Sequence, residues 1–201
     1  MAKSSFELEK WRDYVASAAA GLRDLAVTDR LGAPVEPQDG FRRWIEITRD
    51  VQVGTRHMYL VGNGASAMMA GHFAADACKN GGLAALAFND PALLTATAND
   101  VAFAEVFALP LGRLARRGDL LIAISSSGNS PNILRALEAG RSLAMTLVTL
   151  TGKSPGNRAR SCGDLNFYVP AERYGWVECA HQLLLHYWLD QYLNLYGKGA
   201  L

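Results

Sequence analysis

Residues 120–134 read LLIAISSSGNSPNIL, and this stretch decides the fold. The apolar run at residues 120–124 is typical of a strand buried on both faces of a parallel sheet. A helical pattern begins at Pro131, and proline suits the first position of a helix. A buried strand, a hydroxyl-rich turn and a helix start together predict one βα unit of an α/β fold.

The turn at residues 125–130 predicts an anion-binding site. Backbone N–H groups at a helix start carry the positive end of the peptide dipoles, and short hydroxyls can donate to the same anion. We expect a phosphate monoester, because the turn holds no lysine or arginine and lacks the Gly-x-x-x-x-Gly-Lys pattern of nucleotide-hydrolysing loops. The simpler alternative is that Asn129 or Ser130 only caps the helix, although one cap needs one such side chain and this turn has five.

Short apolar runs alternate with helical patterns on both sides of this stretch. This alternation predicts a single doubly wound α/β domain, with a five-stranded parallel sheet flanked by helices. A ligand would lie beyond the carboxyl ends of the strands, where the GNGAS loop at residues 62–66 would join the serines. We expect strands at about residues 57–62, 83–88, 119–125, 145–150 and 164–169, and helices at about 66–80, 91–97, 101–108, 131–143 and 174–196.

Two further helical segments, at about residues 5–27 and 38–54, precede the first expected strand. We expect residues 1–37 to form an N-terminal helical segment for oligomer packing and residues 38–201 to form the main domain. The first segment has an apolar face at helical spacing. This face covers the sheet of its own chain or packs against another subunit, and the pattern leaves both alternatives open.

The composition limits the kinds of partner that the protein can have. The chain has 201 residues, a formal charge of +1 and 19% charged residues, so it offers no basic field for nucleic acid. Its apolar runs are interrupted before they reach the length of a membrane span, and residues 1–25 show no secretory signal. We therefore expect a soluble, cytoplasmic protein that acts on a small molecule, with no nucleic-acid or membrane partner.

Four residues in two helical patterns are candidates for chemistry. His72 and Asp76 are four residues apart and share a helix face, and Glu178 and His186 lie on one side of the last helix. Two carboxylates and two imidazoles suit acid–base catalysis or a divalent metal such as zinc. The alternatives are a surface ion pair for the first two and satisfied structural groups for the others. The small, apolar neighbours of His72 and Asp76 favour a buried pair.

Two other features have a competing structural explanation. Asn99 and Asp100 fall in an expected loop, where an Asx turn would explain them and a contact to a substrate hydroxyl is the alternative. His181 points to a different side of its helix from His186, so it is the weaker site candidate.

These motifs, in unbroken order, resemble the sugar isomerase (SIS) domain family and, within it, the phosphoheptose isomerases. The resemblance implies an aldose–ketose isomerase that converts sedoheptulose 7-phosphate to D-glycero-D-manno-heptose 7-phosphate, and a homotetramer with active sites at subunit interfaces. It extends from about residue 38 to 195 and rests on residues 62–66, 72–74, 98–100, 124–130, 150–153 and the helix with Glu178, His181 and His186.

The resemblance also implies a role for each site residue. Catalysis would rest on Asp76 as the base and on His186 as the acid, the latter from a neighbouring subunit. Zinc would be bound in some members by residues that align with His72, Asp76, Glu178 and His186. The phosphate would be held by Ser125, Ser126, Ser127 and Ser130, and the sugar would be contacted by Asn63, Ser66, Asn99, Asp100 and Glu178.

The chain departs from the family pattern at three places. Asp76 stands where the family has a glutamate, Glu178 stands where a glutamine is usual, and a longer arginine-bearing loop is reduced to residues 80–82. The added carboxylate should strengthen a divalent site. Two alternatives follow: an isomerase for another sugar phosphate, or a non-catalytic SIS binding module like the family member that associates with the bacterial replication initiator.

Overall fold

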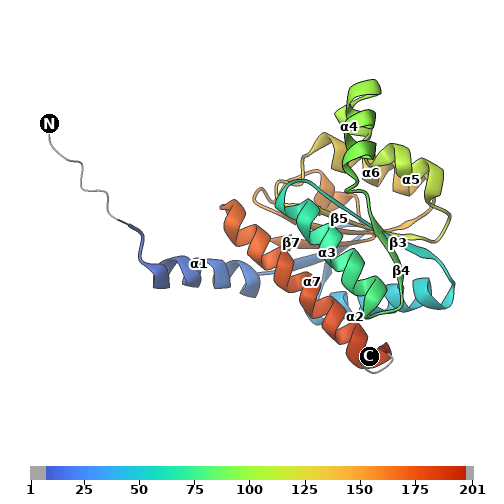
Figure 1. Ribbon diagram of the computed structural model, residues 1–201. Coiled ribbons are helices and arrows are strands. Elements are labelled where there is room, and N and C mark those ends of the chain that lie inside the picture. Colours follow the sequence, from blue (N-terminus) through green and yellow to red (C-terminus); the bar gives the residue numbers. More distant parts are fainter. Residues whose placement is uncertain (1–7, 198–201) are drawn as a thin grey trace, which may run out of the picture.

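Five apolar strands pair in parallel at the centre of the molecule, as the alternation predicts (Figure 1). The computed structural model describes residues 8–197. Two more strands extend the sheet on one side, so its order is β2-β1-β7-β6-β5-β3-β4. The strands are β1 (Ala26–Asp29), β2 (Pro34–Val35), β3 (His57–Gly62), β4 (Ala84–Ala87), β5 (Leu120–Ser125), β6 (Thr146–Gly152) and β7 (Leu165–Val169).

Helices cover both faces of this sheet. Three of them, α2, α4 and α6, have a proline at their start, where the missing N–H costs no hydrogen bond. The helices are α1 (Trp11–Arg23), α2 (Pro37–Val53), α3 (Ala65–Lys79), α4 (Pro91–Asp100), α5 (Ala108–Leu114), α6 (Pro131–Ser142) and α7 (Tyr174–Tyr196), with 3-10 turns η1 (Phe103–Glu105) and η2 (Ala159–Ser161).

The sheet separates two hydrophobic cores. Helices α2, α3 and α7 pack on one face, where the rings of Trp44 and Trp188 stack with centroids 4.8 Å apart. The indole N–H of Trp188 donates to the Thr48 hydroxyl, 3.0 Å away, so this buried polar group is satisfied. Helices α5 and α6 pack on the opposite face with Phe107 and Leu137. These two layers hold the ends of the central strands in place.

The order in which parallel strands are added to the sheet reverses between β3 and β5. From β3 it crosses to β4 on one side, and after β5 it proceeds through β6 and β7 on the other side. The loops that follow β3 and β5 therefore lie next to each other at a topological switch point, where ligands bind in sheets of this type.

The sheet has seven strands, so the prediction of five was incomplete. The helix expected at residues 5–27 is also wrong at its end, because residues 26–29 form β1, which pairs antiparallel with β7. Asp29 turns the chain back into β2 by accepting hydrogen bonds from the N–H groups of Leu31 and Ala33. Residues 5–7 of that prediction lie outside the described residues. The division into residues 1–37 and 38–201 stays a prediction.

The region after α4 also differs from the expectation. The helix expected at residues 101–108 is replaced by η1 and the start of α5. Asn99 and Asp100 form the last turn of α4 rather than a loop, and both are exposed.

In the part of the chain that the structure describes, no helix combines the length and the apolar character needed to cross a membrane.

Candidate active site

The serine turn lies at the end of β5, in the middle of the sheet. Gly128 adopts φ +63°, and its N–H donates to the backbone oxygen and to the hydroxyl of Ser125, at 3.0 and 3.2 Å. A Cβ at this position would lie 1.9 Å from Oδ1 of Asn157. The turn therefore needs glycine both for its left-handed backbone and for the close approach of Asn157.

The hydroxyls of this turn are not used to cap α6. Ser130 occupies the N-cap position, but its side chain makes no capping hydrogen bond. The amide of Asn129 instead accepts from the backbone N–H of Arg158 at 3.1 Å. The Ser126 hydroxyl is buried and has no partner among the described residues. A buried donor without a partner is costly, which favours a ligand over the capping alternative.

A small cavity of about 120 Å³ opens beside the turn. It brings together four elements that are far apart in the sequence, since its walls come from the loop after β3, the serine turn, the start of α3 and the start of α7. The predicted phosphate-binding serines all line it. The lining residues are Asn63, Ser66, Ile124, Ser125, Ser126, Ser127, Ser130, Tyr174 and Glu178.

The loop after β3 is tied to the start of α6 by a pair of side-chain amides. Asn63 and Asn132 exchange two hydrogen bonds of 2.9 and 2.8 Å. Gly62 is required in this loop, because a Cβ there would lie 2.5 Å from the backbone of Ser66. This amide pair holds the two walls of the cavity at a set distance. Sequence reasoning missed Asn132, although its place directly after Pro131 at a helix start marks it as a polar group of the turn.

The acid–base candidates lie between α3 and α7. Nε2 of His72 is 3.4 Å from Oδ2 of Asp76, and the ring of His186 lies 5.8 Å from that of His72, between centroids. The His186 ring also packs edge-on against Phe73, at 4.8 Å. The resemblance assigns His186 to a neighbouring subunit, yet the same chain brings it to His72. We call His72, Asp76 and His186 the imidazole cluster.

The expectation that His72 and Asp76 are buried is wrong. Their side chains are 49% and 30% exposed, because the small, apolar residues of α3 face the sheet and leave these two on the helix flank. An ion pair of this exposure contributes little to stability. The cluster is therefore open to solvent in a single chain.

Glu178 lies apart from the imidazole cluster, in the cavity of the serine turn. Along α7, Glu178, Gln182 and His186 follow at intervals of four residues, so they share one helix face. The amide of Gln182 contacts Nε2 of His186 at 3.1 Å. This face runs from the serine turn to the imidazole cluster.

The four residues of the predicted zinc set do not meet at one point in a single chain. Its donor types, two imidazoles and two carboxylates, suit a divalent metal. Within residues 8–197, however, no three His, Cys, Asp or Glu side chains are grouped closely enough to hold an ion. Glu178 faces the serine turn, and His186 is engaged by Gln182, so the ligands do not converge on one point.

His181 has a structural role, as its ranking as the weaker candidate implies. It is fully buried, and its Nε2 lies 3.1 Å from the backbone oxygen of Thr151, at the end of β6. Burial lowers the pKa of His181 to about 4, so the ring is neutral at pH 7. A neutral ring can donate one N–H to Thr151 and thereby fix α7 against the carboxyl end of the sheet.

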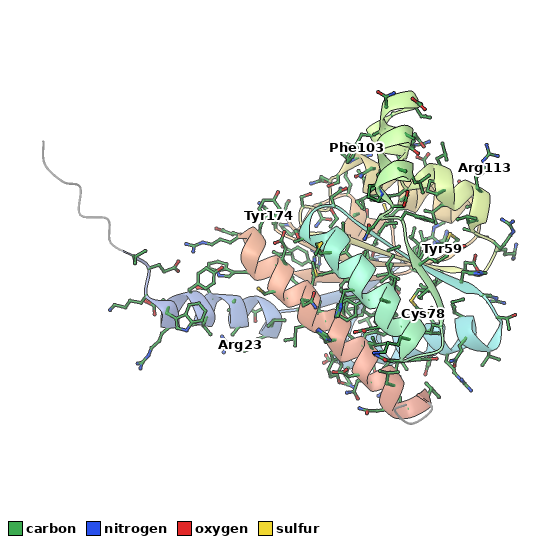
Figure 2. The ribbon with its side chains drawn as sticks, in the orientation of Figure 1. Arg23, Tyr59, Cys78, Phe103, Arg113 and Tyr174 are labelled. Carbon is green, nitrogen blue, oxygen red and sulfur yellow. The ribbon has the colours of Figure 1, made fainter. Side chains whose placement is uncertain are left out.

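Tyr174 lines the cavity, and sequence reasoning missed it. It is the first residue of α7 (Figure 2). Nζ of Lys153 lies 3.8 Å from its ring centroid, so this cation–π contact places a positive charge next to a wall residue of the cavity. By contrast, Asn99 and Asp100 are not among the described residues that line the cavity, and their side chains bond to each other at 2.7 Å.

Comparisons with known proteins agree with this geometry. A model of the SIS domain matches residues 35–152. The phosphoheptose isomerase of Thiobacillus denitrificans is 42% identical over 133 residues, which cover 62% of this chain and 68% of that protein. The phosphoheptose isomerase of Shewanella denitrificans is 34% identical over 171 residues, which cover 79% and 87%. The solved structure of the phosphoheptose isomerase from Neisseria gonorrhoeae superimposes with a TM-score of 0.78 at 29% identity, covering 90% of this chain and 96% of that one.

Proposed function

The chain belongs to the SIS-domain family and, within it, to the phosphoheptose isomerases, and we propose that it interconverts sedoheptulose 7-phosphate and D-glycero-D-manno-heptose 7-phosphate. It is a sugar-phosphate isomerase by this membership. The observation that carries the specific proposal is the cavity beside the start of α6, where the buried hydroxyl of Ser126 has no partner in the part of the chain that the structure describes. Such a site suits the phosphate end of the substrate.

Phosphate binding rests on the serine turn. We assign Ser125, Ser126, Ser127 and Ser130 as donors to the phosphate oxygens, together with the N–H groups at the start of α6. The bound phosphate anchors the sugar at a distance from the reacting carbons, so its binding energy orients them. Asn63, Ser66 and Glu178 line the same cavity and are assigned to the sugar hydroxyls.

The reaction moves one proton between neighbouring carbons. In the ketose-to-aldose direction, Asp76 removes a proton from carbon 1, beside the carbonyl, and the enediol forms while His186 protonates the carbonyl oxygen at carbon 2. The oxygen at carbon 1 then gives its proton to the now neutral His186 as the new carbonyl forms, and carbon 2 receives a proton from the acid form of Asp76, so both groups return to their starting states. One short carboxylate serves both carbons, so substrate position decides the rate.

Other expectations remain part of this proposal. Asn99 and Asp100 are assigned to the substrate by the family resemblance, and their exposed place on α4 suits contact with a neighbouring copy in the expected homotetramer. A cytoplasmic location is kept as a prediction. Zinc is also kept as a prediction of the resemblance, but no step above depends on it, because the described ligands do not converge.

The test is turnover of sedoheptulose 7-phosphate by the purified protein, measured with and without a chelator. We expect conversion to the aldose, and we expect Asp76→Asn to lower kcat by about a thousandfold or more, as loss of a general base does. Asp190→Asn is the matched control, because Asp190 is an exposed aspartate on α7 outside the site. The proposal fails if the wild type converts neither this substrate nor related ketose phosphates, and the non-catalytic binding module then becomes the better description.

A further inference from the structure

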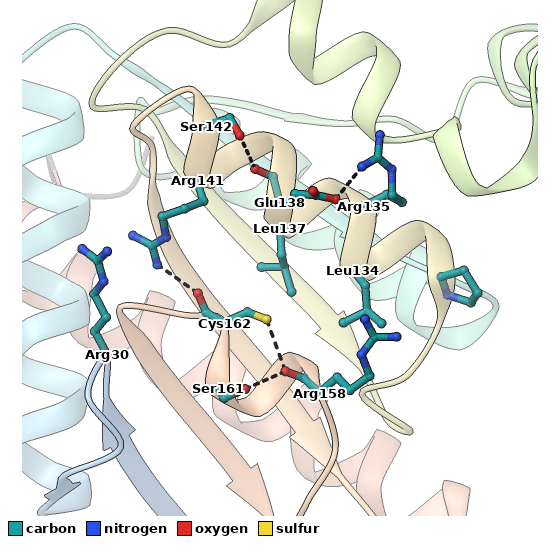
Figure 3. Close-up of a pocket in the computed structure, with 11 residues that line it drawn as sticks. Arg30, Leu134, Arg135, Leu137, Glu138, Arg141, Ser142, Arg158, Ser161 and Cys162 are labelled. Carbon is teal, nitrogen blue, oxygen red and sulfur yellow. Dashed lines mark hydrogen bonds and ion pairs between the residues drawn. The ribbon is translucent and has the colours of Figure 1, made fainter.

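A second and larger cavity lies on the outer side of α6. It has a volume of about 770 Å³ and shares no residue with the cavity of the serine turn. Small-molecule sites commonly have volumes of about 300–1,000 Å³. Its walls are Arg30, Pro131, Leu134, Arg135, Leu137, Glu138, Arg141, Ser142, Arg158, Ser161 and Cys162, and we call it the arginine groove (Figure 3).

The arginine groove has an excess of positive charge. Arg135 is bonded to Glu105 and Glu138, and Arg141 is bonded to Asp164. The side chains of the other two arginines, Arg30 and Arg158, have no carboxylate partner within the described residues. Two unneutralised guanidinium groups beside one cavity favour an anionic ligand with more than one charge.

An apolar strip of Pro131 and Leu134 lines the α6 wall of the groove, where Pro131 is exposed and Leu134 is half-buried. Figure 3 shows Arg30 on one side of the groove and Arg158 on the other, with Leu134 beside Arg158. Leu137 is buried and offers no surface to a ligand. The hydroxyl of Ser161 and the thiol of Cys162 both donate to the backbone oxygen of Arg158, so the floor carries few free polar groups. A flat, weakly polar ring suits this strip.

We propose that the arginine groove binds a nucleoside diphosphate. The guanidinium groups of Arg30 and Arg158 bind the diphosphate, and the base covers Pro131 and Leu134. This ligand joins a multiply charged group to a flat ring, which the sugar phosphate does not, so the two cavities differ in the chemistry that they accept.

Direct hydrogen bonds connect this groove to the serine turn. The N–H of Arg158 donates to the side-chain oxygen of Asn129 at 3.1 Å, and the N–H of Ala159 donates to the backbone oxygen of Gly128 at 2.9 Å. A ligand that orders residues 158–162 therefore also acts on the loop that holds phosphate. Because coupling between two sites is reciprocal, saturation of one cavity changes the affinity of the other.

The experiment is calorimetric titration of the full chain with ADP and with inorganic pyrophosphate, which lacks the base. We expect ADP to bind more tightly than pyrophosphate, and we expect the double variant Arg30→Ala, Arg158→Ala to weaken ADP binding by about tenfold or more. The matched control is Arg113→Ala, an exposed arginine on α5 that lies outside the groove (Figure 2). Ser126→Ala should leave ADP binding unchanged, which separates this site from the serine turn.

The titrations decide the proposal, and no measurement of turnover is needed. Absence of ADP binding, or ADP binding that the double variant leaves intact, overturns the proposal. Loss of ADP binding in Ser126→Ala also overturns it, because the nucleotide would then occupy the serine turn. A change of oligomeric state in the double variant, with no nucleotide bound by the wild type, assigns the groove to contact between copies instead. A dissociation constant for ADP that saturating sedoheptulose 7-phosphate does not alter overturns the coupling.

Discussion

The serine turn and the imidazole cluster, the two halves of the proposed active site, are built in opposite ways. The turn is the end of a central strand, with Ser125 and Ser126 buried and the glycine position confined by Asn157. The cluster stands on the flanks of two helices, where His72 is half exposed. The fold itself therefore shapes the turn to which we assign the phosphate, whereas the cluster to which we assign the chemistry is open to solvent in a single chain.

The largest expected effect on stability is at Gly128, in the serine turn. Gly128→Ala forces a Cβ into Asn157 at a backbone angle that disfavours side chains, so we expect a loss of about 2–4 kcal/mol in the free energy of unfolding and a large rise in KM. Urea unfolding and steady-state kinetics measure both. Gly112→Ala in α5 is the control, because among residues 8–197 its added Cβ would meet no atom within 4 Å apart from its chain neighbours and its own helix backbone. Equal effects in the two variants would contradict the constraint at Gly128.

The pH dependence of stability tests the role of His181, which fixes α7 against the sheet. The pKa of His181 falls from 6.5 in the unfolded chain to about 4 in the folded one, so the unfolded state binds the extra proton first. Stability from this group is complete above pH 6.5 and declines as the pH falls toward 4, by about 2 kcal/mol at pH 5. Urea unfolding of wild type and His181→Gln at pH 7.5 and pH 5 measures this loss. An equal pH dependence in the variant would rule out His181 as its source.

Ser126→Ala should weaken substrate binding while it stabilises the fold. Its hydroxyl is buried and has no partner within residues 8–197, so its removal should raise the free energy of unfolding by about 1 kcal/mol. The same change removes a donor to the phosphate and should raise KM about tenfold. Thermal unfolding and kinetics of the variant test both, with Ser142→Ala on the far end of α6 as control. A loss of stability with unchanged KM would give Ser126 a structural role only.

The smallest expected effect on stability is in the imidazole cluster. His72→Gln removes an exposed pair at 3.4 Å, so the free energy of unfolding should change by less than about 0.5 kcal/mol. Urea unfolding of the variant beside Asp190→Asn measures this. A loss above about 1.5 kcal/mol would mean that the cluster is buried in the working protein, and the contrast between the two halves would then disappear.

Sequence reasoning was most accurate where local chemistry decides the structure. The bounds of α7 and β3 were predicted to the residue, and the serine turn was recognised from its composition alone. It was least accurate at the N-terminal end. Residues 26 and 27 looked helical, but residues 26–29 gain more by pairing with the free edge of β7, which lies more than 130 positions later in the chain. Local propensity cannot register such a partner.

The sequence by itself determined the alternation of strands and helices, the serine turn and the family. Apolar runs, proline at helix starts and glycine in tight turns act within a few residues, so they can be read directly. Only the tertiary structure decided that Glu178 lies beside the serines, that His72 and Asp76 stay exposed, and that Arg30 and Arg158 share one groove. Those features depend on which face each helix turns to the sheet, and burial of apolar surface across the whole chain sets that orientation.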